Sequence, residues 1–199
     1  MNNPAHDERA LAGRFAVGLG YRQALHDEMF VAPAGTFDFV ELHPENYAGL
    51  GGSWRRRLDQ VAARWPVITH GLMMSLGSVD PLDPEFVEAI SGFTYEVGTP
   101  WHSDHLCTSG DQGSQLHDLL PMPMTNESAR RVADRIRDIQ SSFGIPFAIE
   151  NVSAYGRRVE DTLSEPDFVT EVVERADCPI LLDVNNVLVN AINFGLDPL

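Results

Sequence analysis

The chain has 199 residues, of which 43% are hydrophobic and 22% are charged. Roughly 100–200 residues are typical of one domain, and this composition is that of a globular rather than a disordered protein. The 29 acidic residues exceed the 14 basic ones, so the formal net charge is -15. This balance argues against the basic surface that binds nucleic acid and against docking on anionic lipid.

The sequence carries no feature of a membrane or secreted protein. No apolar run reaches the ~18–20 residues that cross a bilayer. Residues 1–10 are polar and acidic, and Cys107 and Cys178 lie far apart, outside any C-x-x-C pair. We therefore expect a cytoplasmic protein with reduced thiols. We also expect a polar N-terminal tail over residues 1–14, followed by one domain over residues 15–199.

Six short apolar runs recur along the chain, and each is typical of a buried parallel strand. They cover residues 15–19, 37–42, 66–70, 100–105, 146–150 and 179–183. Apolar residues at helical spacing predict helices between several of these runs. The predicted helices cover residues 53–65, 84–97, 126–143 and 164–176. Residues 108–124 are rich in Gly, Pro and Met and indicate an insertion or a small hairpin.

Strands that alternate with helices predict right-handed βαβ units, for which two architectures compete. An open doubly wound sheet usually has a glycine-rich phosphate turn after its first strand, and Gly18-Leu19-Gly20-Tyr21 is too short for one. A barrel gathers its chemistry at the carboxyl ends of many strands, so we predict an α/β, TIM-barrel-like (β/α)8 fold. Because a barrel needs about 250 residues, we expect residues 15–199 to form an incomplete one that lacks its last two βα units.

Polar residues follow five successive predicted strands, which would bring their ends to one rim. These residues are His43, Glu45, Asn46, His70, His102, Asp104, His105, Glu150, Asn151, Asp183 and Asn186. Buried imidazoles and carboxylates are costly unless they are paired or bind a metal. Nitrogen and oxygen ligands together suit iron, manganese or zinc, so the pattern predicts a metal site that could hold more than one ion.

The candidates differ in how directly the sequence supports them. Glu150 and Asp183 are the strongest, because each closes an apolar run, and His70 gains support from the similar ends around it. If the fourth strand stays extended, one of Asp104 and His105 points inward, and spacing leaves open which one does.

Three histidines have weaker support. His43 and His102 are equally compatible with a site and with a structural role. His26 lies in polar surroundings, so we expect it at the surface.

Six motifs then follow one another in the chain: FVELHPENY, THGLMMSLGS, SDHL, DLLPMPMT, AIENVSAY and LLDVNNVLVNAINFG. Together, from about Gly18 to Gly195, they resemble the multinuclear non-haem iron-dependent oxidative enzymes. The resemblance implies a TIM barrel that holds two or three iron ions and uses dioxygen to modify cysteine in a ribosomally made precursor peptide. It also implies that a partner protein or a leader-binding domain presents the peptide.

The resemblance also implies roles for individual residues. The implied metal ligands are His70, His105, Glu150, Asp183 and Asn186. The implied catalytic residues are Asp104 and Asn151. Glu45, Asn46, His43 and His102 would orient the ligands. In the family, further strands complete the iron site beyond the position of Leu199, so we expect weak or incomplete metal binding by this chain.

Two other classes of function stay open. A divalent-metal sugar isomerase or phosphodiester hydrolase could use the same strand ends with manganese, magnesium or zinc, and would need no dioxygen. A non-enzymatic binding protein could be built on a decayed barrel, although acidic and histidine strand ends persist along the chain. Iron content after anaerobic purification would separate the iron oxidase from these alternatives.

Overall fold

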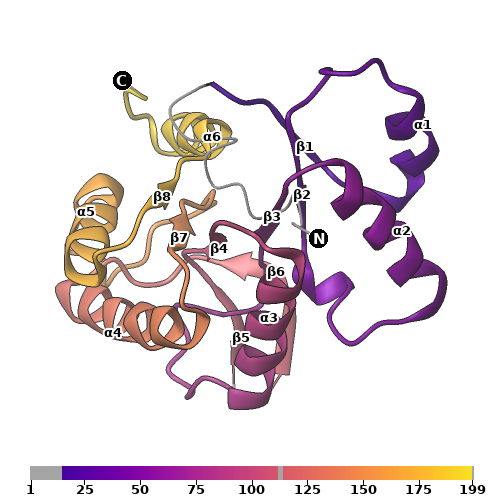
Figure 1. Cartoon of the computed structure of the whole chain (residues 1–199). Helices are drawn as coiled ribbons and strands as arrows, with labels where there is room; N and C mark the ends of the chain where they lie inside the picture. The colour runs from indigo at the N-terminus through magenta and orange to yellow at the C-terminus, as the bar shows by residue number, and fades with distance from the viewer. Residues whose placement is uncertain (1–14, 112–113, 199) are drawn as a thin grey trace. The chain divides into compact units, whose positions relative to one another are not determined.

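The computed structural model describes residues 15–111 and 114–198. Strands and helices alternate along much of the chain, as Figure 1 shows. The strands are β1 (Gly18–Gly20), β2 (Phe39–Leu42), β3 (Val67–His70), β4 (His102–His105), β5 (Thr108–Asp111), β6 (Ser114–Leu120), β7 (Phe147–Glu150) and β8 (Ile180–Leu181). The helices are α1 (His26–Val31), α2 (Gly52–Arg64), α3 (Pro84–Val97), α4 (Asn126–Phe143), α5 (Glu165–Ala176) and α6 (Val184–Phe194).

The main sheet has the strand order β1-β2-β3-β4-β7-β8, which is also the order of these strands along the chain. Pairing is parallel between β1 and β2, between β2 and β3, and between β7 and β8. Parallel neighbours joined through helices are the βαβ units that the sequence predicts. Contacts divide the chain into two compact units, Met1–Gly71 with Glu88–His102, and Leu72–Val87 with Ser103–Leu199.

The first unit is built on β1, β2 and β3 with helix α2. Alternate residues of β2, Val40 and Leu42, are buried, and Val67 of β3 packs in the same cluster. Helix α2 contributes Leu58 and Val61, which lie three residues apart on one face. The apolar periodicity of the sequence thus accounts for this core.

The ring of Phe39 on β2 occupies the space that a side chain at position 18 would take. A Cβ atom on Gly18 would lie 2.1 Å from Cε2 of Phe39, whereas a Cβ atom on Gly20 would meet nothing within 4 Å. Gly18 pairs with Phe39 in the register of the two strands. The first glycine of this segment therefore lets the Phe39 ring lie against β1.

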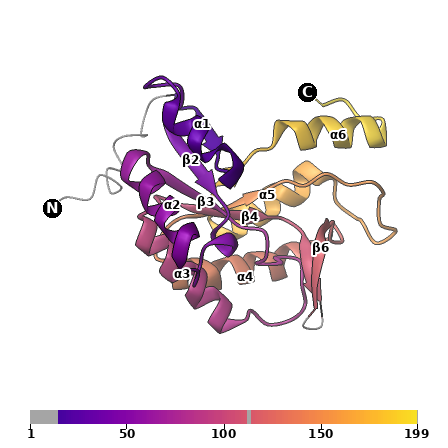
Figure 2. The same cartoon turned by 90° about the vertical axis from the view of Figure 1, so that its right-hand side faces the viewer.

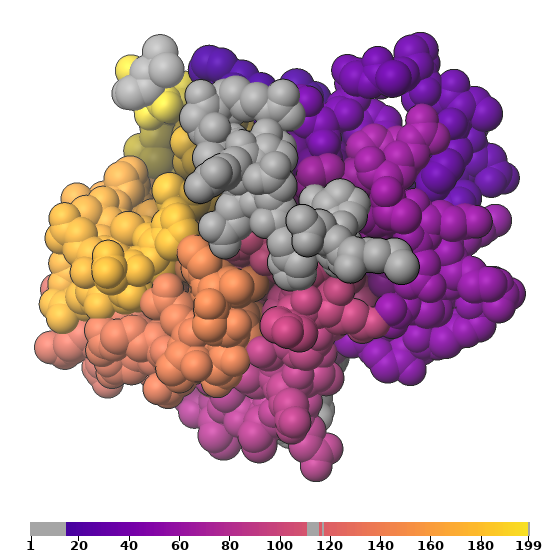
Figure 3. Space-filling model, in the orientation of Figure 1, coloured from indigo at the N-terminus to yellow at the C-terminus, as the bar shows by residue number. Residues whose placement is uncertain are grey.

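In the second unit, helix α4 has the clearest sequence rationale. The Thr125 side chain accepts a hydrogen bond from the Ser128 amide at 3.1 Å, and Gly144 ends the helix in the left-handed conformation. One stripe of α4 is buried, and α4 and α5 pack side by side (Figures 1 and 3). Strands β5 and β6 pair antiparallel, so the predicted hairpin is confirmed.

The predicted helices agree closely with the structure, whereas the strands are shorter than predicted. Residues 84–97 and 126–143 are helical as predicted, and the other two predicted helices are shifted or shortened by one residue at an end. The last strand covers two residues, Ile180–Leu181, because Asp183 already caps helix α6. Helix α6, which was not predicted from the sequence, follows β8 along the chain and is the yellow helix of Figure 2.

The expectation that His26 lies at the surface was wrong. Its side chain is buried at the start of α1, and its Nδ1 atom lies 2.9 Å from the Tyr21 hydroxyl. Its Nε2 atom lies 3.1 Å from Oε1 of Gln60. One partner five residues away and one 34 residues away satisfy this buried imidazole, so the polarity of the adjacent sequence was a misleading indication of its exposure.

Two further expectations bear on the limits of the described chain. The predicted polar tail over residues 1–14 lies outside the described residues. Within residues 15–111 and 114–198, no helix combines the length and the apolar character needed to cross a bilayer. The expected absence of the last two βα units stays a prediction.

Candidate metal centre

In the second unit, β4 and β7 each end in a buried, potentially metal-binding side chain. The Nε2 atom of His105 lies 3.1 Å from Oε2 of Glu150. Both residues are 8% exposed. Strand β7 is buried along its whole length, so its apolar residues hold the carboxylate of Glu150 away from bulk water. An imidazole and a carboxylate in contact can share a proton or bind one cation.

Asp104, which precedes His105 on β4, is fully buried. Its Oδ2 atom accepts a hydrogen bond from the Met74 amide at 3.0 Å, and its Oδ1 atom accepts one from the His105 amide at 2.6 Å. The carboxylate therefore ties the segment after β3 to the end of β4. A role for Asp104 in catalysis stays a prediction, while its hydrogen bonds fix the backbone next to His105.

Asn151 and Asp183 connect the ends of β7 and β8. The Asn151 side chain donates to the Asp183 carbonyl at 3.0 Å and accepts from the Asp183 amide at 2.8 Å. The Asp183 carboxylate accepts from the Asn186 amide at 3.0 Å and so caps α6. Asn186 donates in turn to the Asn151 carbonyl at 2.9 Å. The structure brings these three predicted site residues together in one hydrogen-bonded group.

Helix α6 contributes two more asparagines that the sequence analysis missed. Asn190 accepts a hydrogen bond from the Ala154 amide at 2.7 Å and donates to the Val152 carbonyl at 3.0 Å. Asn193 donates to the Ala154 carbonyl at 2.8 Å. Together with Asn186, they place amides on the side of α6 that faces the segment after β7. Their spacing of four and three residues within an apolar run could have indicated this role.

In the first unit, His70 ends β3, and His43 follows β2. The Nδ1 atom of His43 lies 2.8 Å from the His70 carbonyl oxygen, which can only accept, so Nδ1 carries the proton. The two rings are 5.7 Å apart between centroids. His70 is buried. His43 therefore anchors the backbone at the end of β3.

The remaining candidates of the first unit differ in exposure. His102 is fully buried, with Nδ1 3.0 Å from the Thr69 hydroxyl. Burial, and then the nearby His70, lowers the pKa of His102 to about 3, so the ring is neutral at pH 7. Glu45 is half-buried and Asn46 is exposed, both in the short helix Pro44–Asn46 that follows β2.

Cys107 lies two residues beyond His105 and is completely buried. Burial raises the pKa of its thiol, and the charges of Asp104 and Glu150 raise it further. The thiolate is the nucleophilic form of cysteine. The Cys107 environment thus disfavours a nucleophilic role for this residue.

Parallel strands that alternate with helices and carry buried histidine and acidic side chains at their carboxyl ends are typical of TIM-barrel proteins. Solved structures with this fold include a D-psicose 3-epimerase from Clostridium cellulolyticum H10. It has a TM-score of 0.56 and 12% identity, and the match covers 88% of this chain and 65% of that one. The predicted fold class is confirmed, and the chain forms a partial (β/α) barrel.

A second solved structure of this kind is a sugar phosphate isomerase/epimerase from Parabacteroides distasonis ATCC 8503. Its TM-score is 0.53 at 14% identity, with 94% of this chain and 73% of that chain covered. At such low identity, both likenesses concern the fold alone.

Residues 16–199 match the family described as the RiPP precursor modification enzyme MbnB/TglH/ChrH, and the chain belongs to this family. The resemblance drawn from its motifs is thereby confirmed. A UPF0276 protein of Pseudomonas aeruginosa (strain UCBPP-PA14) is 46% identical over 180 residues, which are 90% of this chain and 63% of the relative. A UPF0276 protein of Haemophilus influenzae is 40% identical over 183 residues, 91% of this chain and 59% of the relative. The chain thus spans about three fifths of the length of these relatives.

Proposed function

We propose that this chain carries part of an enzyme that uses iron and dioxygen to oxidise cysteine in a ribosomally made precursor peptide. Membership of the RiPP precursor modification family supports a peptide substrate. The buried contact between His105 and Glu150 is the observation that supports a bound metal. Iron, when bound, would supply the one-electron and dioxygen chemistry that amino acid side chains lack.

On the resemblance to the family, we propose His70, His105 and Glu150 as metal ligands; each is buried and ends a strand. Two imidazoles and one carboxylate are a donor set that suits ferrous iron, so these residues fit the implied metal. We propose Asp183 and Asn186 as further ligands, on the resemblance to the family. The hydrogen bond from the Asn186 amide to the Asp183 carboxylate would hold both residues near the carboxyl end of β8.

The other polar residues of the site would position these ligands. Asp104 accepts a hydrogen bond from the His105 amide and so fixes the backbone that carries the imidazole. Asn151 holds β8 beside Glu150 through its paired hydrogen bonds with Asp183. Such contacts orient ligands before metal binding, and losing one is expected to weaken metal affinity by about 10–100-fold.

Two partners complete the proposal. The substrate is a cysteine-containing precursor peptide, and a second protein or domain presents it. The net charge of -15 would favour a basic region on either partner.

Iron content tests the metal directly. After anaerobic purification with ferrous iron, we expect the wild-type chain to retain iron at less than full occupancy, in keeping with the incomplete binding that the resemblance implies, as measured by mass spectrometry of the metal. Glu150→Gln should reduce retention by at least about tenfold, because it removes a ligand charge. Glu174→Gln on the exposed face of α5 makes the same charge change and should have no effect. Equal iron contents in the two variants would contradict the proposed ligands.

The reaction is tested with a precursor peptide encoded beside the gene. The mass of the peptide should change only when iron, dioxygen and its cysteine are all present. A cysteine-to-serine peptide is the matched control. Turnover of a sugar with manganese or zinc under anaerobic conditions would instead favour the alternative, a divalent-metal isomerase.

A further inference from the structure

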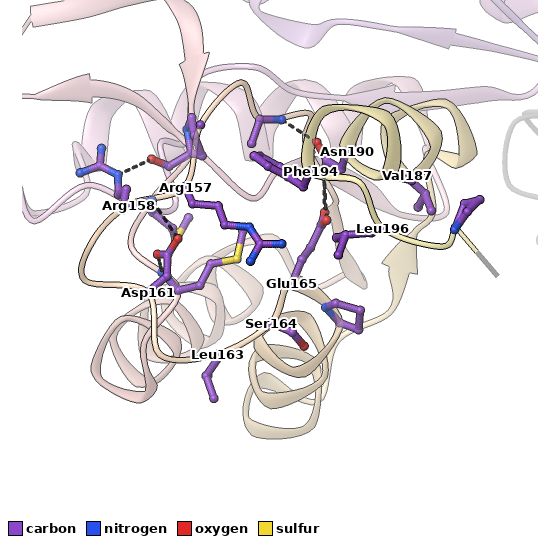
Figure 4. A pocket seen from close by; sticks show the side chains of 18 of the residues that line it. Arg157, Arg158, Asp161, Leu163, Ser164, Glu165, Val187, Asn190, Phe194 and Leu196 are labelled. Atoms are coloured by element: carbon purple, nitrogen blue, oxygen red, sulfur yellow. Dashed lines mark hydrogen bonds between the residues drawn. The ribbon is translucent and has the colours of Figure 1, made fainter.

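One cavity of the second unit has a volume of about 640 Å³. It lies between α6 and the segment that joins β7 to α5 (Figure 4). Its apolar lining includes Met122, Met124, Val187, Phe194 and Leu196. A mainly apolar pocket of this volume is large enough for one or two amino acid side chains.

Three acidic residues line this pocket, Asp161, Glu165 and Asp197. The Asp161 oxygens accept hydrogen bonds from the Met124 and Arg158 amides, at 2.8 Å and 3.0 Å, whereas Glu165 is held by a side-chain amide. Glu165 is half-buried at the first turn of α5, and Asn190 donates to both of its oxygens, at 3.0 Å and 2.9 Å. The Asn190 side chain, which faces Glu165 in Figure 4, also accepts from the Ala154 amide and donates to the Val152 carbonyl. These hydrogen bonds fix the amide that contacts the carboxylate. An amide satisfies the hydrogen bonding of Glu165 but does not neutralise its charge. Partial burial raises the pKa of Glu165, as expected for an acid that has lost part of its hydration.

The pocket also has two basic residues, Arg157 and Arg158, but in a different environment. Both are exposed; the Arg157 guanidinium lies 5.2 Å from the centre of the Phe194 ring, and Arg158 donates to the Pro121 carbonyl at 3.2 Å. A charged ligand group paired with Arg157 would remain in water, where ion pairs contribute little. A cation paired with Glu165 would be partly desolvated and would gain more. This comparison favours a cationic ligand group in the pocket.

Residues next in sequence to two proposed metal ligands line a second cavity that shares part of its wall with the pocket. A smaller cavity of about 20 Å³ shares Met122, Met124 and Glu165 with it and is also lined by Leu106 and Asn151. Leu106 directly follows His105, and Asn151 directly follows Glu150. A peptide held in the larger pocket would therefore have its neighbouring residues close to this part of the site.

We propose that this pocket binds a peptide segment in which an apolar side chain stands next to a lysine or arginine. The apolar side chain would contact Met124 and Phe194, and the basic group would pair with Glu165. This inference rests on the proposed function only in identifying the segment as part of the precursor peptide. The binding site itself requires no metal.

Fluorescence anisotropy with the metal-free full chain tests the pocket. The probes are a fluorescein-labelled Gly-Ser-Gly-Leu-Arg-Gly-Ser-Gly peptide and two counterparts, with Glu in place of Arg and with Ser in place of Leu. We expect the Leu-Arg peptide to bind about tenfold more tightly than the Leu-Glu peptide, the effect of one charge-assisted hydrogen bond. Replacing Leu with Ser should also weaken binding.

Two substitutions of the same kind locate the contact. Glu165→Gln keeps an acceptor for Asn190 and should reduce the preference for Arg over Glu to about twofold or less. Glu160→Gln removes a charge from an exposed position that does not line the pocket, and should leave the preference unchanged. Val187→Trp should fill the pocket and weaken binding of the Leu-Arg peptide. Circular dichroism would show that each variant is folded.

The possible results separate this inference from the proposed function. No binding of the Leu-Arg peptide, or equal effects of the two glutamine substitutions, would overturn the pocket proposal. Discrimination that depends on Glu165 in a protein that fails to bind iron would support the pocket and contradict the iron enzyme. Iron retention without discrimination between the peptides would support the iron enzyme and contradict the pocket proposal.

Discussion

At the scale of single residues, His102 shows how burial changes the chemistry of a side chain. Its ring has no exposed surface and has the Thr69 hydroxyl within hydrogen-bonding distance. The sequence placed it in a run of polar residues, His102-Ser103-Asp104-His105, from which its environment could not be read. All four residues of β4 are buried in the structure. Burial on both faces of a strand depends on elements far away in sequence.

The lowered pKa of His102 predicts a dependence of stability on pH. In the unfolded chain His102 takes up a proton near pH 6.5, whereas in the folded chain its pKa is about 3. Between these values the unfolded state binds more protons, so stability falls as the pH decreases. This one group should lower the free energy of unfolding by about 2 kcal/mol from pH 7 to pH 5.

Urea unfolding of the wild type and of His102→Gln at both pH values measures this effect. The glutamine variant should lose less stability on acidification than the wild type, by about 2 kcal/mol. As a second measurement, the His102 ring proton should keep its NMR chemical shift from pH 8 to pH 5. An equal loss of stability in both proteins would show that His102 is protonated in the folded state.

At the scale of elements, helix α6 is where sequence and structure differ most. The helices whose apolar residues repeat at helical spacing, such as α3 and α4, were predictable because one face is buried against the rest of its unit. Helix α6 has an apolar composition, with Leu188 and Ile192 exposed and Asn190 buried. Its buried asparagine reverses the usual pattern, so a periodicity argument could not find this helix.

The hydrogen bonds of Asn190 predict a large effect for its removal. Asn190→Ala would leave the Ala154 amide and the Val152 carbonyl without this partner and would free the Glu165 carboxylate. Because unsatisfied buried polar groups cost about 1–3 kcal/mol each, we expect a loss of about 2–3 kcal/mol in the free energy of unfolding.

Asn185→Ala is the matched control, since Asn185 is an exposed residue of the same helix. It should change the free energy of unfolding by less than about 0.5 kcal/mol. Urea unfolding followed by circular dichroism measures both variants. If Asn190→Ala were as stable as Asn185→Ala, α6 would not be anchored through this side chain.

At the scale of the whole molecule, the sequence predicted that polar residues at strand ends would gather along one edge. It left open whether Asp104 or His105 points inward, and in the structure it is His105 that contacts Glu150. It did not predict the pocket lined by Glu165 and Phe194, because the two residues come from different helices of which one was missed. Short local patterns predict strands and helices, whereas a cavity depends on how several elements pack together.

The excess of acidic residues is another property of the whole chain. The exposed ion pairs of Arg137 with Asp134 and of Arg175 with Glu171 lie within single helices and contribute little to stability. The 29 acidic residues face 14 basic ones, so repulsion between carboxylates is the larger electrostatic effect at pH 7. Salt screens such repulsion over a Debye length that falls to about 10 Å at 0.1 M.

We therefore expect the free energy of unfolding to increase by about 1 kcal/mol between 10 mM and 300 mM sodium chloride at pH 7. Urea unfolding at each salt concentration measures the change, and the metal-free chain avoids any effect of salt on metal binding. A decrease in stability with salt at pH 7 would mean that attractive ion pairs outweigh repulsion, contrary to the charge count.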